Sequence, residues 1–549
     1  MTKAWILSVG PSKKQWVNPA MKSSKRKRLA LHLDQQIEGT VYTDQTTLQR
    51  YSTDKSIYQV VPQMVVSPAS MEDLTTIVST ARDENLSVTA RGGGSGTAGA
   101  ALGEGIVIHL PRNGFLGNIV DFSTGAGKDY ITVEAGVYHD TIQTFLKKEG
   151  YYLPADPSSS PLCQIGGNIA TKASGPHGFS HGSIDRFLQD IEYISARGEH
   201  IDSARPKSIP PTLRAALTQL QEKVRADKAT VSLLKKRRNF KTASGYNLFA
   251  LMAELQPEKI LAQLFAGSVG SLGLITRATL RVEPYTPEKA ALLLYFTDLH
   301  ALSLATQEAI AAEVTAIEVI SQATIRLLKR RKGAGSDELH NGHLLFIECE
   351  GPMRQARLAQ LKEKLRKSPN LLVPPQEAQT EEELAKLWKI RKQILPVLLR
   401  PGAGMKALSI VNDVGVPPQH LAHFIEDIET FFRKKGLETV IYGHAGNGNL
   451  HLRPLINIKE TDLKERIQAI ADGVYEIVFR YKGTITAEHA MGRLRTPYLE
   501  REWGSSIYRH MKRVKDIFDP DNILNPEAMF GRGAITDKMR HDLFEPVQK

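Results

Sequence analysis

A glycine-rich loop between two predicted strands places the strongest constraint on the fold of this chain. The stretch RGGGSGTAG contains Gly94, Gly96 and Gly99 in GxGxxG spacing. That spacing is typical of a dinucleotide site when the third glycine opens a helix. Here the chain instead continues through Gly103 and Gly105 into the predicted strand GIVIHL. A run of unobstructed backbone N–H groups remains, which suits a phosphate and disfavours nicotinamide binding.

A second glycine-rich stretch, GHAGNGNLH at 443–451, contains two histidines. Its glycines predict a tight turn, and neutral imidazole is the commonest side-chain metal ligand. Downstream, ITAEHAMG supplies Glu488 and His489. His444, His451 and Glu488 could form a two-histidine, one-carboxylate site that leaves positions open for substrate. The alternative is that both histidines are only hydrogen-bonding residues of a surface turn.

Composition bounds the class of protein. The chain has 549 residues and two cysteines, Cys163 and Cys349, with no CxxC spacing. It therefore cannot supply a disulfide framework or a cysteine-ligated cluster. No apolar run approaches the roughly 20 residues needed to cross a bilayer, and the opening segment is too poor in apolar residues for a signal peptide. We expect a cytoplasmic protein, with peripheral contact at the inner membrane as the alternative.

The net charge of +12 is compatible with nucleic acid, an anionic membrane or acidic substrates. Basic residues cluster at 22–28 and 233–241, and neither cluster belongs to a nucleic-acid-binding motif. We expect no nucleic-acid partner. A solvated face is the favoured explanation of both clusters, ahead of peripheral membrane contact.

Alternating strand and helix patterns indicate an α+β chain with two domains. Residues 1–54 form a basic lead-in. Residues 55–285 form a first domain with a charged helical insertion at about 205–242. Residues 286–530 form a second domain, and residues 531–549 a tail. No repeat of fixed period is visible.

Five stretches of the first domain resemble the vanillyl-alcohol-oxidase (PCMH-type) FAD-binding domain, in the order of that family. They are VVSPASMEDL, ARGGGSGTAGAAL, ITVEAGV, LPADPSSSPLCQIGGNIATKASGP and LFAGSVGSLGLITRATLRV. The resemblance implies FAD. It places the cofactor against Gly92, Gly93, Gly94, Ser95, Gly96, Pro157, Ser158, Gly166, Gly167, Asn168, Gly267, Ser268, Leu274 and Ile275.

Two positions depart from relatives of the FAD domain. Val269 stands where many have glutamate, so we expect no acidic contact there. Ser95 stands where relatives with covalent FAD have histidine, so we expect noncovalent FAD.

The pairing of GHAGNGNLH with a later AEHAMG resembles the FAD-linked oxidase C-terminal domain of D-2-hydroxyacid dehydrogenases. That family includes D-lactate, glycolate and D-2-hydroxyglutarate enzymes. The resemblance implies an antiparallel substrate (cap) domain in which His444, His451 and Glu488 bind a divalent ion, usually zinc. It implies that His489 is the base that takes the hydroxyl proton while a hydride passes from C2 to flavin N5.

The same resemblance extends to the stretch LWKIRKQILPVLLRPGAGMKALSIVNDVGVP. It implies that Arg391 and Lys406 hold a substrate carboxylate, the alternative being a helical surface arginine and a loop lysine. Arg453 replaces an asparagine found in many relatives, and lies two residues beyond His451 on the same side of a strand. It could hold a second carboxylate. Asn447 and Ala490 also depart from the usual aspartate and glycine.

These motifs predict an FAD- and metal-dependent dehydrogenase of a small D-2-hydroxy acid. Because the chain lacks cluster ligands and a nicotinamide motif, we expect electrons to pass to an external quinone, cytochrome or iron–sulfur partner. One alternative is an FAD-dependent alcohol or sugar oxidase of the same fold that uses oxygen. Another is a basic, non-enzymatic binding protein that kept the fold. The sequence leaves the particular 2-hydroxy acid and the oligomeric state open.

Overall fold

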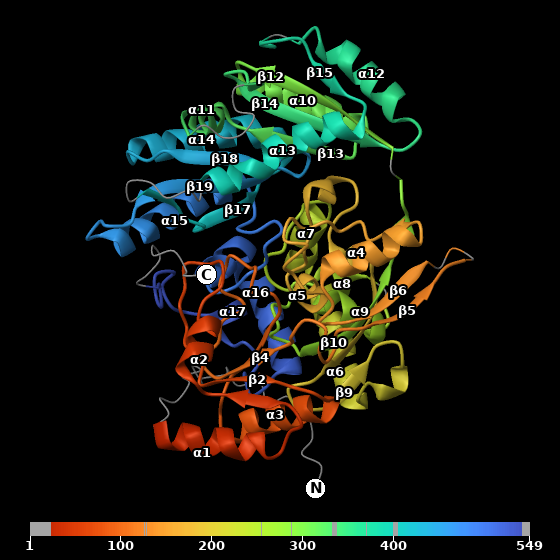
Figure 1. Cartoon of the computed structure of the whole chain (residues 1–549), viewed down its shortest axis with the longest axis vertical. Helices are drawn as coiled ribbons and strands as arrows, with labels where there is room; N and C mark the ends of the chain where they lie inside the picture. Colours follow the sequence, from red (N-terminus) through yellow and green to blue (C-terminus); the bar gives the residue numbers. More distant parts are fainter. Residues whose placement is uncertain are drawn as a thin grey trace.

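The computed structural model describes residues 23–540 except 126, 128, 254, 287, 332–337, 369 and 399–404. Two lobes are visible (Figure 1). The lower lobe contains residues 23–286 and 499–540, and the upper lobe contains residues 288–480. The segment 481–498 connects them. None of the described helices combines the length and apolar character that a membrane-spanning helix needs.

The lower lobe begins with a small sheet around the glycine loop. Helix α3 (Met71–Asp83) links two of its parallel strands and is capped by Ser70, whose side chain accepts the Asp73 N–H. Strand β1 pairs with β2, although we expected residues 1–54 to precede the domain. The first domain therefore starts earlier than predicted. The strand order is β1 (Thr40–Tyr42), β2 (Met64–Ser67), β4 (Ile106–His109), β3 (Val88–Arg91), with α1 (Ser23–Asp34) and α2 (Gln45–Tyr51) beside it.

A second, antiparallel sheet completes the lower lobe. Its order is β5 (Ile119–Ser123), β6 (Tyr130–Glu134), β10 (Leu274–Arg281), β8 (Leu188–Ile194), β9 (His200–Asp202), and β7 (Tyr151–Tyr152) pairs separately with β11 (Glu283–Pro284). Its helices are α4 (His139–Lys148), α5 (Ile165–Ala170), α6 (Pro211–Ala226), α7 (Lys228–Arg237), α8 (Phe249–Met252) and α9 (Pro257–Phe265). The predicted insertion corresponds to α6 and α7. Helix α6 buries leucines at positions 213, 217 and 220, the spacing of one helix face.

The upper lobe is built on one antiparallel sheet, as expected for this α+β class. Its order is β15 (Gln376–Ala378), β12 (Lys289–Phe296), β14 (His343–Glu350), β13 (Ala316–Ile320), β18 (Thr439–His444), β19 (Asn449–Asn457), β16 (Met405–Ala407), and β17 (Val411–Gly415) also pairs with β19. One face packs against α10 (Leu299–Ala311), α12 (Arg354–Leu365), α14 (Leu421–Lys434) and α15 (Leu463–Arg480). The other packs against α11 (Gln322–Arg330) and α13 (Glu381–Leu398).

The C-terminal helices return to the lower lobe, where Figure 1 shows α16 (Leu499–Phe518) and α17 (Glu527–Phe530). The Val88 N–H donates to the Ile523 carbonyl at 2.8 Å, and the Asn525 amide donates to the Val269 carbonyl at 2.7 Å. The last part of the predicted second domain, up to residue 530, therefore packs against the lower lobe. Helical periodicity shows that a segment buries one face, but not which core covers that face.

The predicted tail also belongs to the lower lobe as far as residue 540. The Tyr58 hydroxyl donates to the Ile535 carbonyl at 2.8 Å. The remaining residues of the tail, 541–549, and the first 22 residues of the lead-in lie outside the described residues.

Candidate active site

The predicted metal ligands converge on the sheet face that also packs against α13. His451 on β19 is directly opposite Tyr442 on β18, so it shares a face with Tyr442 and His444. The Nε2 atoms of His444 and His451 lie 3.4 and 3.3 Å from Glu488 Oε1. Glycine shapes the turn between the strands, because Gly448 has φ +62° and a Cβ there would lie 1.8 Å from the Val416 carbonyl oxygen.

Both lobes support these three side chains. Glu318 on β13 accepts hydrogen bonds from His444 Nδ1 and, at 2.6 Å, from Arg391 Nε. Glu488 Oε2 accepts from Lys241 Nζ at 3.0 Å and from Ser174 Oγ at 3.1 Å, both in the lower lobe. Glu488 is thereby held with its other oxygen, Oε1, towards the two histidines.

The electrostatics distinguish the two histidines. Burial alone would lower the pKa of His444, but the carboxylates of Glu318 and Glu488 raise it to about 9. Burial lowers the pKa of His451 to about 4, so His451 is neutral at pH 7. Burial opposes ionisation of Glu488, but Lys241 and His444 hold its pKa well below the usual range. A protonated His444 thus lies between two carboxylates.

This donor set fits a divalent ion. Two imidazole nitrogens and one carboxylate oxygen, with ligand atoms within 4.8 Å of one another, are ligands that zinc accepts in sites with an open position. The Nδ1–H of His444 donates a hydrogen bond to Glu318, which is the usual arrangement for a histidine that binds a metal through Nε2. Binding would displace the proton of His444.

His489, the predicted base, lies beside the ligand set. Its ring stacks on that of His451, with centroids 5.4 Å apart and planes 17° apart. Its side chain is 30% exposed, whereas those of His444 and His451 are 3% and 8% exposed. His489 is therefore the most accessible of the three to a reacting molecule.

The three predicted substrate-binding residues differ in their surroundings. Arg453 on β19 is 7% exposed, its Nε is buried without a hydrogen-bond partner, and it forms no ion pair with another described residue. Arg391 is paired with Glu318 and stacks over the Tyr442 ring at 4.4 Å. Lys406 has no described polar partner, and β16 aligns it with Ile456, out of phase with the strand positions of His451 and Arg453.

Glycines bring the predicted FAD-contacting loops together in the lower lobe. A Cβ at Gly92 would lie within 3.8 Å of Gln164 and Gly167, and one at Gly93 would lie 1.7 Å from the Leu162 carbonyl oxygen. The third loop joins them through the Gly267 N–H, which donates to the Ile169 carbonyl at 3.0 Å. Three stretches separated in sequence thus lie side by side, as FAD binding requires.

Open space and unpaired polar atoms also fit the cofactor. A Cβ at Gly96 or Gly167 would meet nothing within 4 Å. The side chains of Asn168 and Ser268 are buried, yet Asn168 Nδ2 and Ser268 Oγ have no hydrogen-bond partner. Because buried polar groups are nearly always paired, these atoms are suited to a polar ligand.

The remaining predicted FAD residues vary in exposure. Gly94 has φ +63°, Ser95 and Gly166 are half-buried, Pro157 is buried and Ser158 is exposed. Leu274 packs in the apolar core with Ile194 and Ile523, whereas Ile275 is half-buried.

Several residues of the site were missed by the sequence predictions. Lys241 belongs to the basic cluster 233–241 that we expected to be solvated, but its side chain is 8% exposed because it bonds Glu488. Asp413 accepts backbone N–H groups of Glu488 and His489, and Asn412 is opposite His451 with both amide atoms unpaired. The signal for both was a polar pair inside the apolar strand SIVNDVGVP.

The fold and the glycine cradle define an FAD-dependent oxidoreductase. Residues 62–204 match the family model of the FAD binding domain, and residues 286–529 match that of the FAD linked oxidases, C-terminal domain. The chain belongs to the FAD-linked oxidoreductases that combine these two domains.

Two relatives are consistent with membership of this family. The chain is 26% identical over 506 residues to the glycolate oxidase subunit GlcD of Bacillus subtilis, covering 91% of this chain and 96% of that one. It is 27% identical over 525 residues to the D-2-hydroxyglutarate dehydrogenase of Escherichia coli, covering 89% of this chain and 50% of the relative. The chain thus matches about half the length of that second relative.

The solved structure of 4-ethylphenol oxidase from Gulosibacter chungangensis has the same fold. It aligns with a TM-score of 0.65 at 14% identity, covering 94% of this chain and 98% of the other. At this identity the likeness concerns the fold alone.

Proposed function

We propose that the protein oxidises a D-2-hydroxy acid to the 2-oxo acid, with noncovalent FAD and a divalent metal ion. The observation that carries the proposal is the convergence of His444, His451 and Glu488, with the more accessible His489 stacked beside them. The two relatives described above are named for glycolate and D-2-hydroxyglutarate, which are both 2-hydroxy acids.

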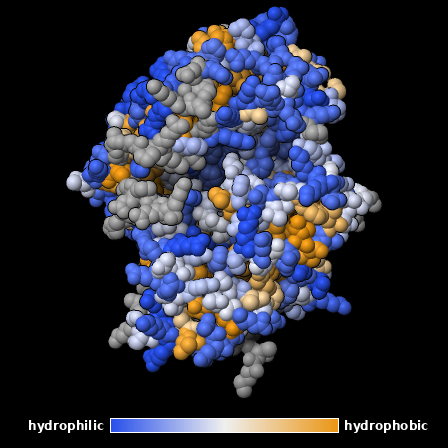
Figure 2. Space-filling model, viewed as in Figure 1, coloured by the Kyte–Doolittle hydropathy of each residue, from blue (hydrophilic) through white to orange (hydrophobic). Residues whose placement is uncertain are grey.

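Bound metal would lower the pKa of the substrate hydroxyl, and bound flavin would accept the hydride from C2. His489 takes the hydroxyl proton, because it is the accessible histidine of the cluster. Glu488 is kept ionised for its role as ligand by Lys241. Figure 2 shows the surface hollowed between the two lobes, where a substrate could enter.

Arg453 favours a substrate with a second carboxylate. Arg453 is buried and its Nε has no described hydrogen-bond partner, which is costly; a carboxylate would remove that cost by accepting a charge-assisted hydrogen bond. The charge of Arg391 is already partly neutralised by Glu318. Arg391 would therefore orient a substrate carboxylate, and would add little to the net positive charge of the site. A dicarboxylate such as D-2-hydroxyglutarate therefore suits the site at least as well as D-lactate.

The electrons pass to an external acceptor, a quinone, a cytochrome or an iron–sulfur protein. The two cysteines of the chain are free and buried, too few for a four-cysteine cluster. NAD reduction as fast as the reduction of an artificial dye would contradict this acceptor. Acid precipitation should release the yellow cofactor into the supernatant, whereas colour retained in the pellet would contradict noncovalent binding.

Anaerobic mixing with a panel of D- and L-2-hydroxy acids tests the reaction itself. The flavin should bleach with one or more D-acids, and a dicarboxylate should be among the best. Bleaching by L-acids only would contradict the stereochemistry. No bleaching by any member would contradict the proposed substrate class.

A further inference from the structure

Asp413 lies at an irregularity in strand β17, next to the candidate base. The pairing of β17 with β19 shifts register between Asn412 and Val414, which makes Asp413 the extra residue of a β-bulge. Its φ is +105°, a conformation that side-chain-bearing residues rarely adopt, and it is fully buried. Bulges of this kind re-aim a side chain, and strained backbone clusters at functional sites.

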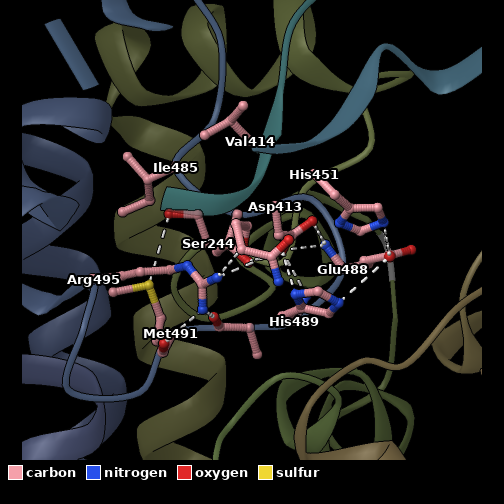
Figure 3. A network of polar contacts seen from close by, with 12 residues as sticks. Ser244, Asp413, Val414, His451, Ile485, Glu488, His489, Met491 and Arg495 are labelled. Carbon is pink, nitrogen blue, oxygen red and sulfur yellow. Dashed lines mark hydrogen bonds and ion pairs between the residues drawn. The ribbon is translucent and has the colours of Figure 1, made fainter. Parts of the chain in front are cut away.

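The bulge directs the Asp413 carboxylate towards the segment that carries both Glu488 and His489 (Figure 3). Asp413 Oδ2 accepts the His489 N–H at 2.8 Å and the Thr486 hydroxyl at 2.6 Å. The Glu488 N–H lies 3.1 and 3.2 Å from the two carboxylate oxygens, and Asn449 Nδ2 donates to Oδ1 at 2.8 Å. These bonds fix the backbone from which the candidate ligand and base project.

Neither ring nitrogen of His489 forms a hydrogen bond with a described residue, and Nε2 lies 3.6 Å from Glu488 Oε1. Nδ1 is buried and forms no hydrogen bond, and it lies 3.8 Å from Asp413 Oδ2. That distance is too long for a hydrogen bond in this state. Catalytic hydrogen bonds are often long in a free enzyme and tighten when substrate binds, so a small ring movement would form the bond.

Asp413, His451 and His489 also have ligand atoms close enough together for a metal ion. A metal role for Asp413 is disfavoured, because both its oxygens already accept hydrogen bonds from the backbone, Thr486 and Asn449. Arg495, 4.0 Å from Oδ2, supplies the compensating charge. These bonds give the carboxylate a role in holding this segment and not in binding an ion.

We infer that Asp413 is the positioning residue of the base: it accepts a hydrogen bond from His489 Nδ1 and leaves Nε2 to take the substrate proton. A carboxylate behind a histidine fixes its tautomer and ring orientation in this way. The inference rests on the proposed function, in which His489 is the base. It adds a residue to that reaction and explains the strained bulge.

The test compares the holoenzyme with Asp413→Asn and with the control Asp519→Asn. Asp519 is also buried, also accepts two backbone N–H groups and also has a cationic neighbour, Lys515, but it lies in the C-terminal turn after α16. Rapid anaerobic mixing gives the limiting rate of flavin bleaching and the substrate Kd. We expect Asp413→Asn to lower the limiting rate about 10- to 100-fold with Kd changed less than about 3-fold. Asp519→Asn should keep the wild-type rate per bound flavin.

Combining Asp413→Asn with His489→Ala distinguishes positioning of the base from a general structural role. If Asp413 acts through His489, adding Asp413→Asn to the His489→Ala variant should lower the limiting rate of flavin bleaching by less than about 3-fold. Equal losses in both backgrounds would overturn the inference. So would an unchanged rate for Asp413→Asn, or an equal loss for Asp519→Asn.

A structure of the wild-type protein with substrate provides a second measurement that requires no variant to fold. The distance from His489 Nδ1 to Asp413 Oδ2 should shorten to about 3 Å. A distance that stays near 3.8 Å would overturn the inference. If no 2-hydroxy acid bleaches the wild-type flavin, the proposed function fails; if the wild type bleaches and Asp413→Asn bleaches equally fast, only the role of Asp413 fails.

Discussion

Two histidines, the half-buried His177 and the buried His444, each lie between two carboxylates where the lobes meet, but their surroundings differ. His177 Nδ1 lies 2.5 Å from Asp156 Oδ2, and its Nε2 lies 2.7 Å from Glu348 Oε1. His444 contacts Glu318 and Glu488 in the same way. Each carboxylate pair raises the pKa of its histidine, to about 10 for His177 and about 9 for His444, although burial alone would lower both.

The His177 cluster is largely paired within the protein. Glu348 also accepts from Trp388 Nε1 at 2.6 Å and from Lys289 Nζ at 3.2 Å. Lys289 contacts Glu350 as well, so an ammonium group already occupies the place that a metal ion would need. His177 and Asp156 belong to the lower lobe, and Glu348, Glu350, Lys289 and Trp388 belong to the upper lobe, so this cluster joins the lobes.

The His444 cluster is surrounded by polar atoms that lack partners. His451 Nδ1, His489 Nδ1, Arg453 Nε and both amide atoms of Asn412 are buried and unpaired. Two such atoms, Asp156 Oδ1 and His181 Nε2, also lie near His177, against five near His444. Because such atoms cost free energy, the larger number beside His444 indicates where a ligand belongs. A paired cluster stabilises the interface between lobes, and an unpaired one is prepared for binding.

The largest expected effect is the loss of a metal ligand. His451→Ala, or chelation of the wild type, should lower turnover more than about 100-fold, because substrate polarisation is lost. The flavin should stay bound, since its cradle lies in the lower lobe. The matched control is His177→Gln, which should keep turnover per bound flavin. Full activity of metal-free protein would remove the functional difference between the two clusters.

The next effect concerns the base. His489→Ala should still bind substrate but bleach its flavin about 100-fold more slowly, the low end for loss of a general base. Stopped-flow absorbance under anaerobic conditions measures this rate. An unimpaired variant would show that another group takes the proton.

A smaller effect is expected at Arg453, which separates substrates by charge. Arg453→Met should raise the KM for D-2-hydroxyglutarate about 10- to 100-fold and that for D-lactate less than about 3-fold, because only the former has a second carboxylate. Thermal stability should not fall, since the substitution removes a buried cation that forms no ion pair with another described residue. Equal changes in both KM values would mean that Arg453 does not bind the second carboxylate.

The smallest effect is on stability and depends on pH. The carboxylates of Asp156 and Glu348 raise the pKa of His177 to about 10 in the folded protein, above the value of 6.5 for a free histidine that we take for the unfolded chain. Its stabilisation is therefore fully present below pH 6.5 and is lost as pH rises through 10. His177→Gln should lower Tm by a few degrees near pH 6 and by progressively less towards pH 10. A Tm difference that is independent of pH would mean that His177 is not a cationic link between the lobes.

Much of the local structure, and the convergence of His444, His451 and Glu488, could be predicted from the sequence. The alternation of polar and apolar residues indicates the helices and strands, and the turn at Gly448 brings His444 and His451 onto adjacent strands of one sheet. Spacing within a few residues is enough for such predictions, because strand alternation and turn geometry are local properties.

Tertiary structure decided the partners of these residues. Lys241 and Ser174 bond Glu488 from 247 and 314 residues away, and Asp413 reaches His489 across 76 residues through a bulge. Tertiary structure also placed α16 and α17 against the lower lobe and brought Asp156 and Glu348 to His177. Local sequence patterns cannot specify such pairs, because which buried charges meet depends on how the two lobes pack and on which strand positions are in register.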